Sequence, residues 1–221
     1  MLAKELISDT VPCLRTSDTA NKALQWMEIF RISHLPIVND KELLGVISDT
    51  DIYDLNSTDE PIGNHELSLF TPYVFYNQHI YEVLELISKL KLTMVPVLNE
   101  KKEYMGLIVM QDIVREFANI SALQNPGGII VLELNDHDYS LSQVANIVES
   151  NNTKILSMYI TSTKIAGELN LTLKMNKTDL TDVIATFERF GYKIKASFME
   201  DKDMDSFYDE RYEAFLRYLN T

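Results

Sequence analysis

The sequence predicts an α/β (α+β) protein made of two similar βαββα units, a βαββαβ unit and a terminal helix. Three observations support this fold class. A block of residues recurs after an interval of 60 residues. Short apolar strands alternate with amphipathic helices along the chain. The pattern then changes after the turn Asn-Pro-Gly-Gly at 125–128, where we expect a domain boundary.

The internal repeat consists of two blocks with the same order of residues. The first carries SHLPIV at 33–38 and LGVI at 44–47, and the second carries TMVPVL at 93–98 and MGLI at 105–108. Pro36 and Pro96 lie 60 residues apart, and Asp51 and Asp112 lie 61 apart because the second polar turn holds one extra residue. The spacing indicates a duplicated structural unit.

Each block predicts the same elements. An amphipathic helix comes first, with apolar residues at i, i+3, i+4 and i+7: Ala20, Ala23, Leu24 and Met27, then Ile80, Val83, Leu84 and Ile87. Thr16 or Ser17 is placed to cap the first of these helices, and Asn77 the second. Two strands around a polar turn follow, and a second short helix starts near Asp49 or Met110.

The third unit alternates strands and helices in a different order. Strands are predicted at 129–134, 155–161, 169–175 and 192–198, with helices at 141–148 and 180–187. Thr178 or Asp179 is expected to start the second of these helices. The resulting order, βαββαβ, is the ferredoxin-like arrangement.

The last segment, 200–221, is acidic at first and then helical in pattern. Its apolar stripe consists of Tyr208, Tyr212, Phe215 and Leu219. A single helix of about 15 residues is marginally stable in water, so the stripe should pack on its own domain or across a dimer. We place repeat one at 1–58, repeat two at 59–122, a linker at 123–127, the third domain at 128–199 and the terminal helix at 200–221.

Composition excludes several classes of function. The formal net charge of -13 repels nucleic acid, and the sequence contains no basic patch to overcome it. No apolar stretch is long enough for a membrane span, and the N-terminus lacks a signal peptide. Cys13 is the only cysteine, so no intrachain disulfide forms. We therefore expect a cytoplasmic protein with no nucleic-acid or membrane partner.

Catalysis and metal binding are not expected. The four histidines have no metal-ligand spacing, and neither a glycine-rich phosphate loop nor a nucleophile elbow is present. We interpret His34 as a satisfied structural residue and Cys13 as a small buried hydrophobe. Asp136, His137 and Asp138 could bind a cation, although a solvated turn explains them equally well. No catalytic residue, metal ligand or obligatory cofactor is predicted.

The duplicated blocks resemble a known family. Residues 35–38 with 45–52, and residues 95–98 with 106–113, resemble the signature segments of the cystathionine-β-synthase (CBS) domain, which occurs in tandem pairs called Bateman modules. Residues 128–199 resemble an ACT domain. The order of a CBS pair followed by an ACT-like domain resembles the acetoin-utilisation accessory proteins of bacteria.

The CBS resemblance implies a non-catalytic regulatory protein that binds an adenine-containing ligand between the repeats. Asp51 and Asp112 would accept the ribose hydroxyls, and Ser48 with the nearby helix N-terminus would serve an anion. An apolar, backbone-lined slot for adenine would come from four strand residues: Leu35, Ile37, Val95 and Val97. The alternative is that Asp51 and Asp112 only cap their helices.

Departures from the family pattern make the two expected sites unequal. Where Ser48 has a hydroxyl, the second repeat has Val109, which cannot donate a hydrogen bond. The residue before each aspartate, often basic in the family, is Thr50 or Gln111, and Asp49 and Asp54 add negative charge. We therefore expect the first site to be the better one. AMP, adenosine or S-adenosylmethionine is favoured over ATP.

The ACT resemblance leaves two roles open. Ser140 stands where the family has a glycine, and its side chain hinders close approach of a ligand to the backbone. Dimerisation is therefore favoured over amino-acid sensing for this domain. We expect a homodimer that passes the ligand signal to a regulated protein the sequence does not identify. The alternative function is a constitutive dimeric scaffold or interaction protein with degenerate pockets.

Overall fold

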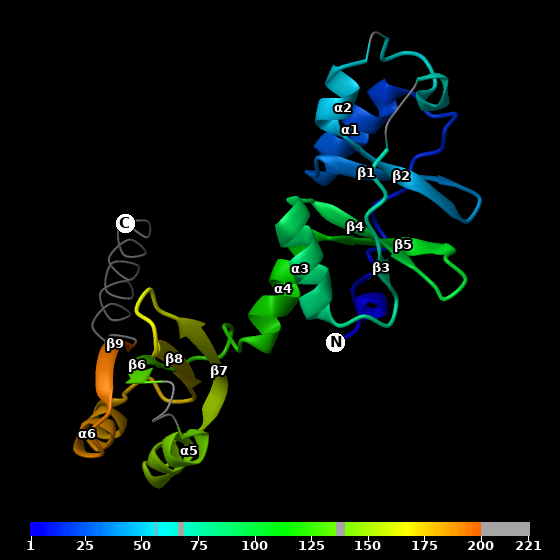
Figure 1. The fold of residues 1–221 in the computed structure, drawn as a ribbon. Helices are drawn as coiled ribbons and strands as arrows, with labels where there is room; N and C mark the ends of the chain where they lie inside the picture. The colour runs from blue at the N-terminus through cyan, green and yellow to red at the C-terminus, as the bar shows by residue number, and fades with distance from the viewer. Residues whose placement is uncertain (56, 66–68, 136–139, 200–221) are drawn as a thin grey trace, which may run out of the picture. The chain divides into compact units, whose positions relative to one another are not determined.

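The computed structural model of the chain describes residues 1–55, 57–65, 69–135 and 140–199 (Figure 1). The chain divides into two compact units, Met1–Glu116 and Phe117–Thr221. This division lies within helix α4 (Met110–Ile120). The domain limits expected from the sequence remain predictions. The predicted terminal helix at 200–221 and the possible cation ligands Asp136, His137 and Asp138 lie outside the described residues.

The first repeat is built around a two-stranded hairpin. Its elements are η1 (Ala3–Leu6), α1 (Ala20–Phe30), β1 (His34–Asn39), β2 (Glu42–Ser48), α2 (Asp49–Tyr53) and η2 (Ile62–Asn64). β1 and β2 pair antiparallel. The expected leading strand is reduced to one parallel bridge between Leu14 and Ile37. Among the described residues of this repeat, the hairpin therefore forms the whole sheet.

The second repeat has the full βαββα order. Its elements are β3 (Val74–Phe75), α3 (Ile80–Leu90), β4 (Met94–Leu98), β5 (Tyr104–Val109) and α4. β3 runs parallel to β4, and β4 antiparallel to β5. The pairing register shifts after Ile37 in β1 and after Val97 in β4, at positions 60 residues apart. The duplication thus extends to the irregularity in the hairpin.

The expected helix caps were wrong by two or three residues. Thr19, rather than Thr16 or Ser17, caps α1 by accepting the Lys22 N–H at 3.2 Å. The preceding residues instead form a turn, in which the Asp18 carboxylate accepts the Arg15 N–H.

The cap of α3 was also misplaced. His79, rather than Asn77, caps this helix by accepting the Tyr81 N–H at 3.3 Å.

Each repeat has its own apolar core, but the first core is shared. It combines Leu35, Ile37, Ile47 and Ile52 of the first repeat with Met94, Leu107 and Val109 of the second. The other core holds residues of the second repeat together with Ala3 and Leu6 from the N-terminus. The two repeats are therefore packed as one body inside the first unit.

The second unit has the predicted βαββαβ order. It contains β6 (Ile129–Asn135), α5 (Leu141–Ser150), β7 (Ile155–Ser162), β8 (Glu168–Met175), α6 (Thr181–Arg189) and β9 (Lys193–Phe198). The sheet order is β7-β8-β6-β9 with every pair antiparallel, which is the ferredoxin-like topology. Helix α6 begins at Thr181, one residue after the expected start at 180, and Asp179, one of the two expected starting residues, accepts the Thr181 N–H at 3.0 Å.

One face of this sheet packs against the two helices. Ile130, Leu132 and Leu134 of β6 are buried with Val144 and Val148 of α5 and with Phe187 of α6. Their alternation along β6 follows the period of a strand. In the part of the chain that the structure describes, no helix is both long and apolar enough to cross a bilayer.

Candidate functional site

The first candidate site is the junction between β2 and α2. Ser48 ends β2 and is the N-cap of α2, and Asp51 is the third residue of that helix. Asp51 Oδ2 accepts both the Ser48 N–H, at 2.8 Å, and the Ser48 hydroxyl, at 2.7 Å. Ser48 Oγ in turn accepts the Asp51 N–H at 3.1 Å. The structure therefore joins Ser48 and Asp51 in a reciprocal capping box.

This box occupies only one oxygen of the Asp51 carboxylate. No described residue donates a hydrogen bond to Asp51 Oδ1, and Asp51 as a whole is exposed. Capping and ligand binding are therefore compatible at this residue, because a carboxylate offers about four acceptor positions on its two oxygens. Asp51 therefore contributes to the cap of α2, while the alternative that it only caps stays a prediction.

The helix N-terminus itself has little left to offer an anion. The first three N–H groups of α2 already donate within the protein: Asp49 to the Ser33 carbonyl at 3.0 Å, Thr50 to Asp49 Oδ1 at 2.7 Å, and Asp51 to Ser48 Oγ. The same turn carries the carboxylates of Asp49 and Asp51. Our expectation that this N-terminus would serve a phosphate therefore lacks the donors it requires.

The corresponding junction in the second repeat has a different chemistry. Val109 ends β5 and is buried, and its side chain has no polar atom that could cap α4. Asp112 Oδ1 accepts from Arg115 Nη1 at 2.8 Å, and the side chains of Asp112 and Arg115 are 27% and 69% exposed. Arg115 was not singled out in the sequence, although a pair at i and i+3 on a helix is a recognisable signal.

The four strand residues expected to line an adenine slot lie inside the two cores. Leu35 and Ile37 belong to the first core, and Val95 and Val97 to the second, each with at most 1% of its surface exposed. The structure thus separates these residues from Ser48 and Asp51 at the surface. Their side chains are therefore not available to a ligand at the surface.

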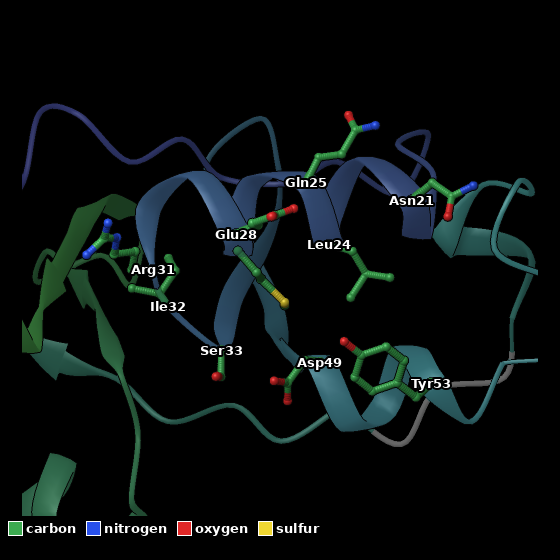
Figure 2. Close-up of a pocket in the computed structure, with 10 residues that line it drawn as sticks. Asn21, Leu24, Gln25, Glu28, Arg31, Ile32, Ser33, Asp49 and Tyr53 are labelled. Carbon is green, nitrogen blue, oxygen red and sulfur yellow. The ribbon is translucent and has the colours of Figure 1, made fainter.

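A cavity of about 560 Å³ lies between α1 and α2 of the first repeat (Figure 2). Its lining is mostly polar, and the residues are Asn21, Leu24, Gln25, Met27, Glu28, Arg31, Ile32, Ser33, Asp49 and Tyr53. Figure 2 shows Leu24 of α1 pointing toward Tyr53 of α2. A cavity of this size lies in the range of small-molecule sites.

None of the seven predicted site residues lines this cavity, although two of its lining residues are close to them in sequence. Ser33, which immediately precedes His34, lines the cavity. Asp49, which lies two residues before Asp51, also lines it. The polar lining residues of α1 were missed because the sequence pattern identifies only its apolar face, which contributes Leu24 and Met27 to the lining. Nothing local in the sequence indicates that its polar face would oppose α2.

The second unit contains a smaller cavity, of about 370 Å³. It is lined by Glu133, Leu134, Asn135, Gln143, Glu168, Phe190, Gly191, Tyr192 and Lys193. Lys193 forms an ion pair with Glu133, which raises the pKa of the lysine. Ser140, the residue expected to crowd a ligand, instead caps α5 by accepting the Gln143 N–H at 3.4 Å. The cavity therefore combines two carboxylates, two amides, an ammonium group and an exposed aromatic ring.

Metal-binding groups are scattered in the described part of the chain. There, no three histidine, cysteine, aspartate or glutamate side chains gather closely enough to hold an ion. Cys13 is only partly buried, rather than fully buried as expected.

A comparison with protein families identifies the repeated unit. The sequence model of the CBS domain matches residues 3–57 and 69–119. These two segments form a CBS domain pair. The match covers both hairpins and both candidate junctions, so the duplicated motif found in the sequence is confirmed as a tandem of CBS domains.

Solved structures that resemble the chain include other CBS proteins. A CBS domain pair/ACT domain protein from Thermotoga maritima is 21% identical, with a TM-score of 0.48 over 54% of this chain and 98% of that one. Hypoxic Response Protein I, solved with two coordinated zinc ions, is 28% identical, with a TM-score of 0.43 over 52% and 98%. CBSX2, solved in complex with AMP, is 17% identical, with a TM-score of 0.46 over 54% and 97%.

Proposed function

We propose that this chain is a non-catalytic regulatory protein that binds an adenosine-containing ligand at Ser48 and Asp51 of its first CBS domain. CBS domain pairs are typically regulatory and nucleotide-binding. The observation that carries the proposal is the state of Asp51. One carboxylate oxygen is fixed by Ser48, while the other accepts no hydrogen bond from a described residue. A fixed, exposed carboxylate is suited to ribose hydroxyls.

The ligand should carry little phosphate charge. The carboxylates of Asp49 and Asp51 stand in the first turn of α2, whose first N–H groups are already used. A triphosphate at this position would meet repulsion without compensating donors. We therefore expect adenosine, AMP and S-adenosylmethionine to bind with higher affinity than ATP. The second CBS domain does not provide an equivalent ligand site. Asp112 forms an ion pair with Arg115, and Val109 has no hydroxyl.

Transmission of the signal is assigned to a homodimer. The ferredoxin-like unit acts as an ACT-like dimerisation domain, and a regulated protein reads the change in dimer geometry. The resemblance to acetoin-utilisation accessory proteins belongs to this proposal. Analytical ultracentrifugation with and without adenosine tests it, because a chain that stays monomeric at micromolar concentration in both states would exclude transmission through a dimer.

Isothermal titration calorimetry tests the ligand. Adenosine, AMP, S-adenosylmethionine and ATP are titrated into the intact chain, with one site per chain expected. The Asp51→Asn variant should lose roughly tenfold or more in affinity, since a hydrogen bond to a charged group contributes about 1.5–3 kcal/mol. Asp54→Asn is the matched control, because it removes an exposed carboxylate at the other end of α2. Its affinity should stay within about twofold of the wild type.

Two results would contradict the proposal. One is the absence of heat with all four ligands on folded, nucleotide-free protein. The other is equal affinity in the wild type and the Asp51→Asn variant. Either result would favour the constitutive dimeric scaffold, for which the melting temperature stays constant across the same ligand panel.

The cavity of about 370 Å³ in the second unit supports a second candidate function, amino-acid sensing by the ACT-like domain. Glu133, Glu168 and Lys193 provide charges of both signs for a zwitterion. A thermal-shift panel of amino acids distinguishes this function from the first, because Glu168→Gln should abolish an amino-acid shift and leave adenosine binding unchanged.

A further inference from the structure

The two CBS domains are linked by hydrogen bonds between residues far apart in the chain. The Ser33 N–H donates to Thr93 Oγ1 at 3.0 Å, and the Thr93 N–H donates to His34 Nδ1 at 3.3 Å. Gln111 Nε2 donates to the Arg31 carbonyl at 3.1 Å. We call these three bonds the inter-repeat joint. They connect the segment 31–34, between the end of α1 and the start of β1, with the start of β4 and of α4.

His34 takes part in the joint as an acceptor. Because the Thr93 N–H points at Nδ1, this nitrogen carries a lone pair, and in the neutral ring the proton is on Nε2. The Thr93 hydroxyl lies 3.0 Å from the same nitrogen. A second proton on the ring would place an N–H of His34 against the N–H of Thr93. Protonation therefore breaks the bond from the Thr93 N–H to Nδ1, while the new Nδ1–H can donate to the Thr93 hydroxyl oxygen.

The same ring also faces the candidate ligand site. His34 is the register partner of Ser48 across the hairpin. Burial lowers the pKa of His34 below its usual value, and the carboxylates of Asp49 and Asp51 on α2 act in the opposite direction. From the second repeat, the ring is met by Thr93, which does not titrate. The imidazole of His34 thus forms part of the joint and also interacts electrostatically with the carboxylates of the candidate site.

We propose that His34 is a positioning residue that couples occupancy of the Ser48–Asp51 site to the inter-repeat joint. The ligand in this inference rests on the proposed function, whereas the joint exists without it. Neutral His34 holds Thr93. Protonated His34 is drawn to Asp51, the carboxylate that would receive the ribose hydroxyls. Ligand and proton then compete, and linkage requires each to weaken the binding of the other.

The joint is tested first without ligand, by following the Thr93 amide in a ¹⁵N NMR titration between about pH 8 and about pH 5. We expect the Thr93 signal to move together with the His34 ring, with a midpoint below about 6.5. In His34→Asn the side-chain oxygen remains an acceptor but does not titrate, so the movement should disappear. If the chemical shift of the Thr93 amide does not change as His34 titrates, the proposal is overturned.

A second histidine provides the matched control. His79 also accepts a backbone N–H through Nδ1, from Tyr81 at 3.3 Å, but it caps α3 and takes no part in the joint. His79→Asn should leave the Thr93 profile unchanged. If it abolishes the Thr93 movement as His34→Asn does, the movement reports a general effect of histidine loss and the proposal fails.

The coupling is tested with adenosine, which carries no phosphate to titrate. Calorimetry at about pH 8 and about pH 5 should show a loss of roughly tenfold in affinity for the wild type, the change produced by one pKa unit of coupling. His34→Asn should lose less than about twofold. Equal losses in the two proteins would overturn the coupling. Absence of adenosine binding at both pH values would reject the proposed function and the coupling with it, and the ligand-free titration would then decide the joint alone.

Discussion

In the first repeat, β2 ends at Ser48, which caps α2 and fixes Asp51; in the second, β5 ends at buried Val109, and Asp112 pairs with Arg115. The backbone around these residues is the same in both repeats. The N–H that follows each hairpin donates to an equivalent carbonyl, Asp49 to Ser33 and Met110 to Thr93, each at 3.0 Å. The fold of a repeat therefore does not depend on the side chains that would bind a ligand.

The lesson is that duplication preserves packing more strictly than chemistry. Ile47 and Ile108 occupy equivalent strand positions and are both fully buried, whereas Ser48 and Val109, one residue later, differ in polarity. A buried position accepts only a side chain of similar shape. The position that follows it, Ser48 in one repeat and Val109 in the other, can lose its hydroxyl when ligand binding does not require one.

The largest effect should test the equivalence of the two cores. Ile47→Ala and Ile108→Ala should each lower the free energy of unfolding by about 2–5 kcal/mol, the range for losing a buried isoleucine side chain. Urea unfolding followed by fluorescence of Trp26, the single tryptophan, measures both, because this residue packs on the first core. Ile29→Ala, on the exposed surface of α1, is the control. Loss of stability in only one of the two core variants would break the comparison.

The next effect should measure the capping box that only the first repeat has. Ser48→Ala should lower the free energy of unfolding by about 1 kcal/mol, since it removes an N-cap side chain. Thr50→Ala is the control, because it removes a neighbouring exposed hydroxyl that caps no helix. Thermal unfolding by circular dichroism provides the measurement. A smaller loss for Ser48→Ala than for Thr50→Ala would contradict the assigned role.

A third experiment gives the first helical turns of α2 and α4 the same number of carboxylates. The first turn of α2 carries Asp49 and Asp51, whereas α4 carries Asp112 alone. Asp49→Asn keeps the oxygen that accepts the Thr50 N–H and removes the charge. The affinity for ATP should rise about fivefold relative to adenosine, as expected for about 1 kcal/mol of repulsion between charges near water. Calorimetry with both ligands decides, and an unchanged ratio would remove the electrostatic argument against ATP.

The smallest effect concerns the ion pair of the second repeat. Arg115→Ala should change the free energy of unfolding by about 0.5 kcal/mol or less, because the pair lies at the surface. The number of adenosine sites should remain one per chain, since Val109 still lacks a hydroxyl. A stoichiometry of two would mean that Arg115, rather than Val109, closes the second site. Calorimetry and thermal unfolding measure the two quantities.

Much of the fold could be predicted because its signals are local. Apolar residues with the periods of strands and helices predicted the repeated hairpins and the βαββαβ order of the second unit. The helix starts were less accurate, since several Ser, Thr, Asp and Asn residues compete for each cap. At α1 the competition was decided by Asp18, whose bond to Arg15 moved the helix start to Thr19.

The candidate site was predicted in part for the same reason. The bond between Ser48 and Asp51 joins residues three apart, so a motif can reveal it. The link from His34 to Thr93 joins residues 59 apart, and no pattern along the chain predicts which histidine meets which threonine. The burial of Leu35 and Val95 likewise depends on how the hairpins pack, which the alternation of residues in a strand does not specify.

The shared first core has a consequence for the covalent linkage of the two repeats. Met94, Leu107 and Val109 of the second repeat complete the core of the first. A half-chain severed near residue 58 would leave part of that core open to water, and the missing apolar surface could be restored by its other half. Two separately expressed halves should therefore reassemble. Covalent linkage of the two repeats thus keeps at hand the apolar surface that either half alone would have to find in solution.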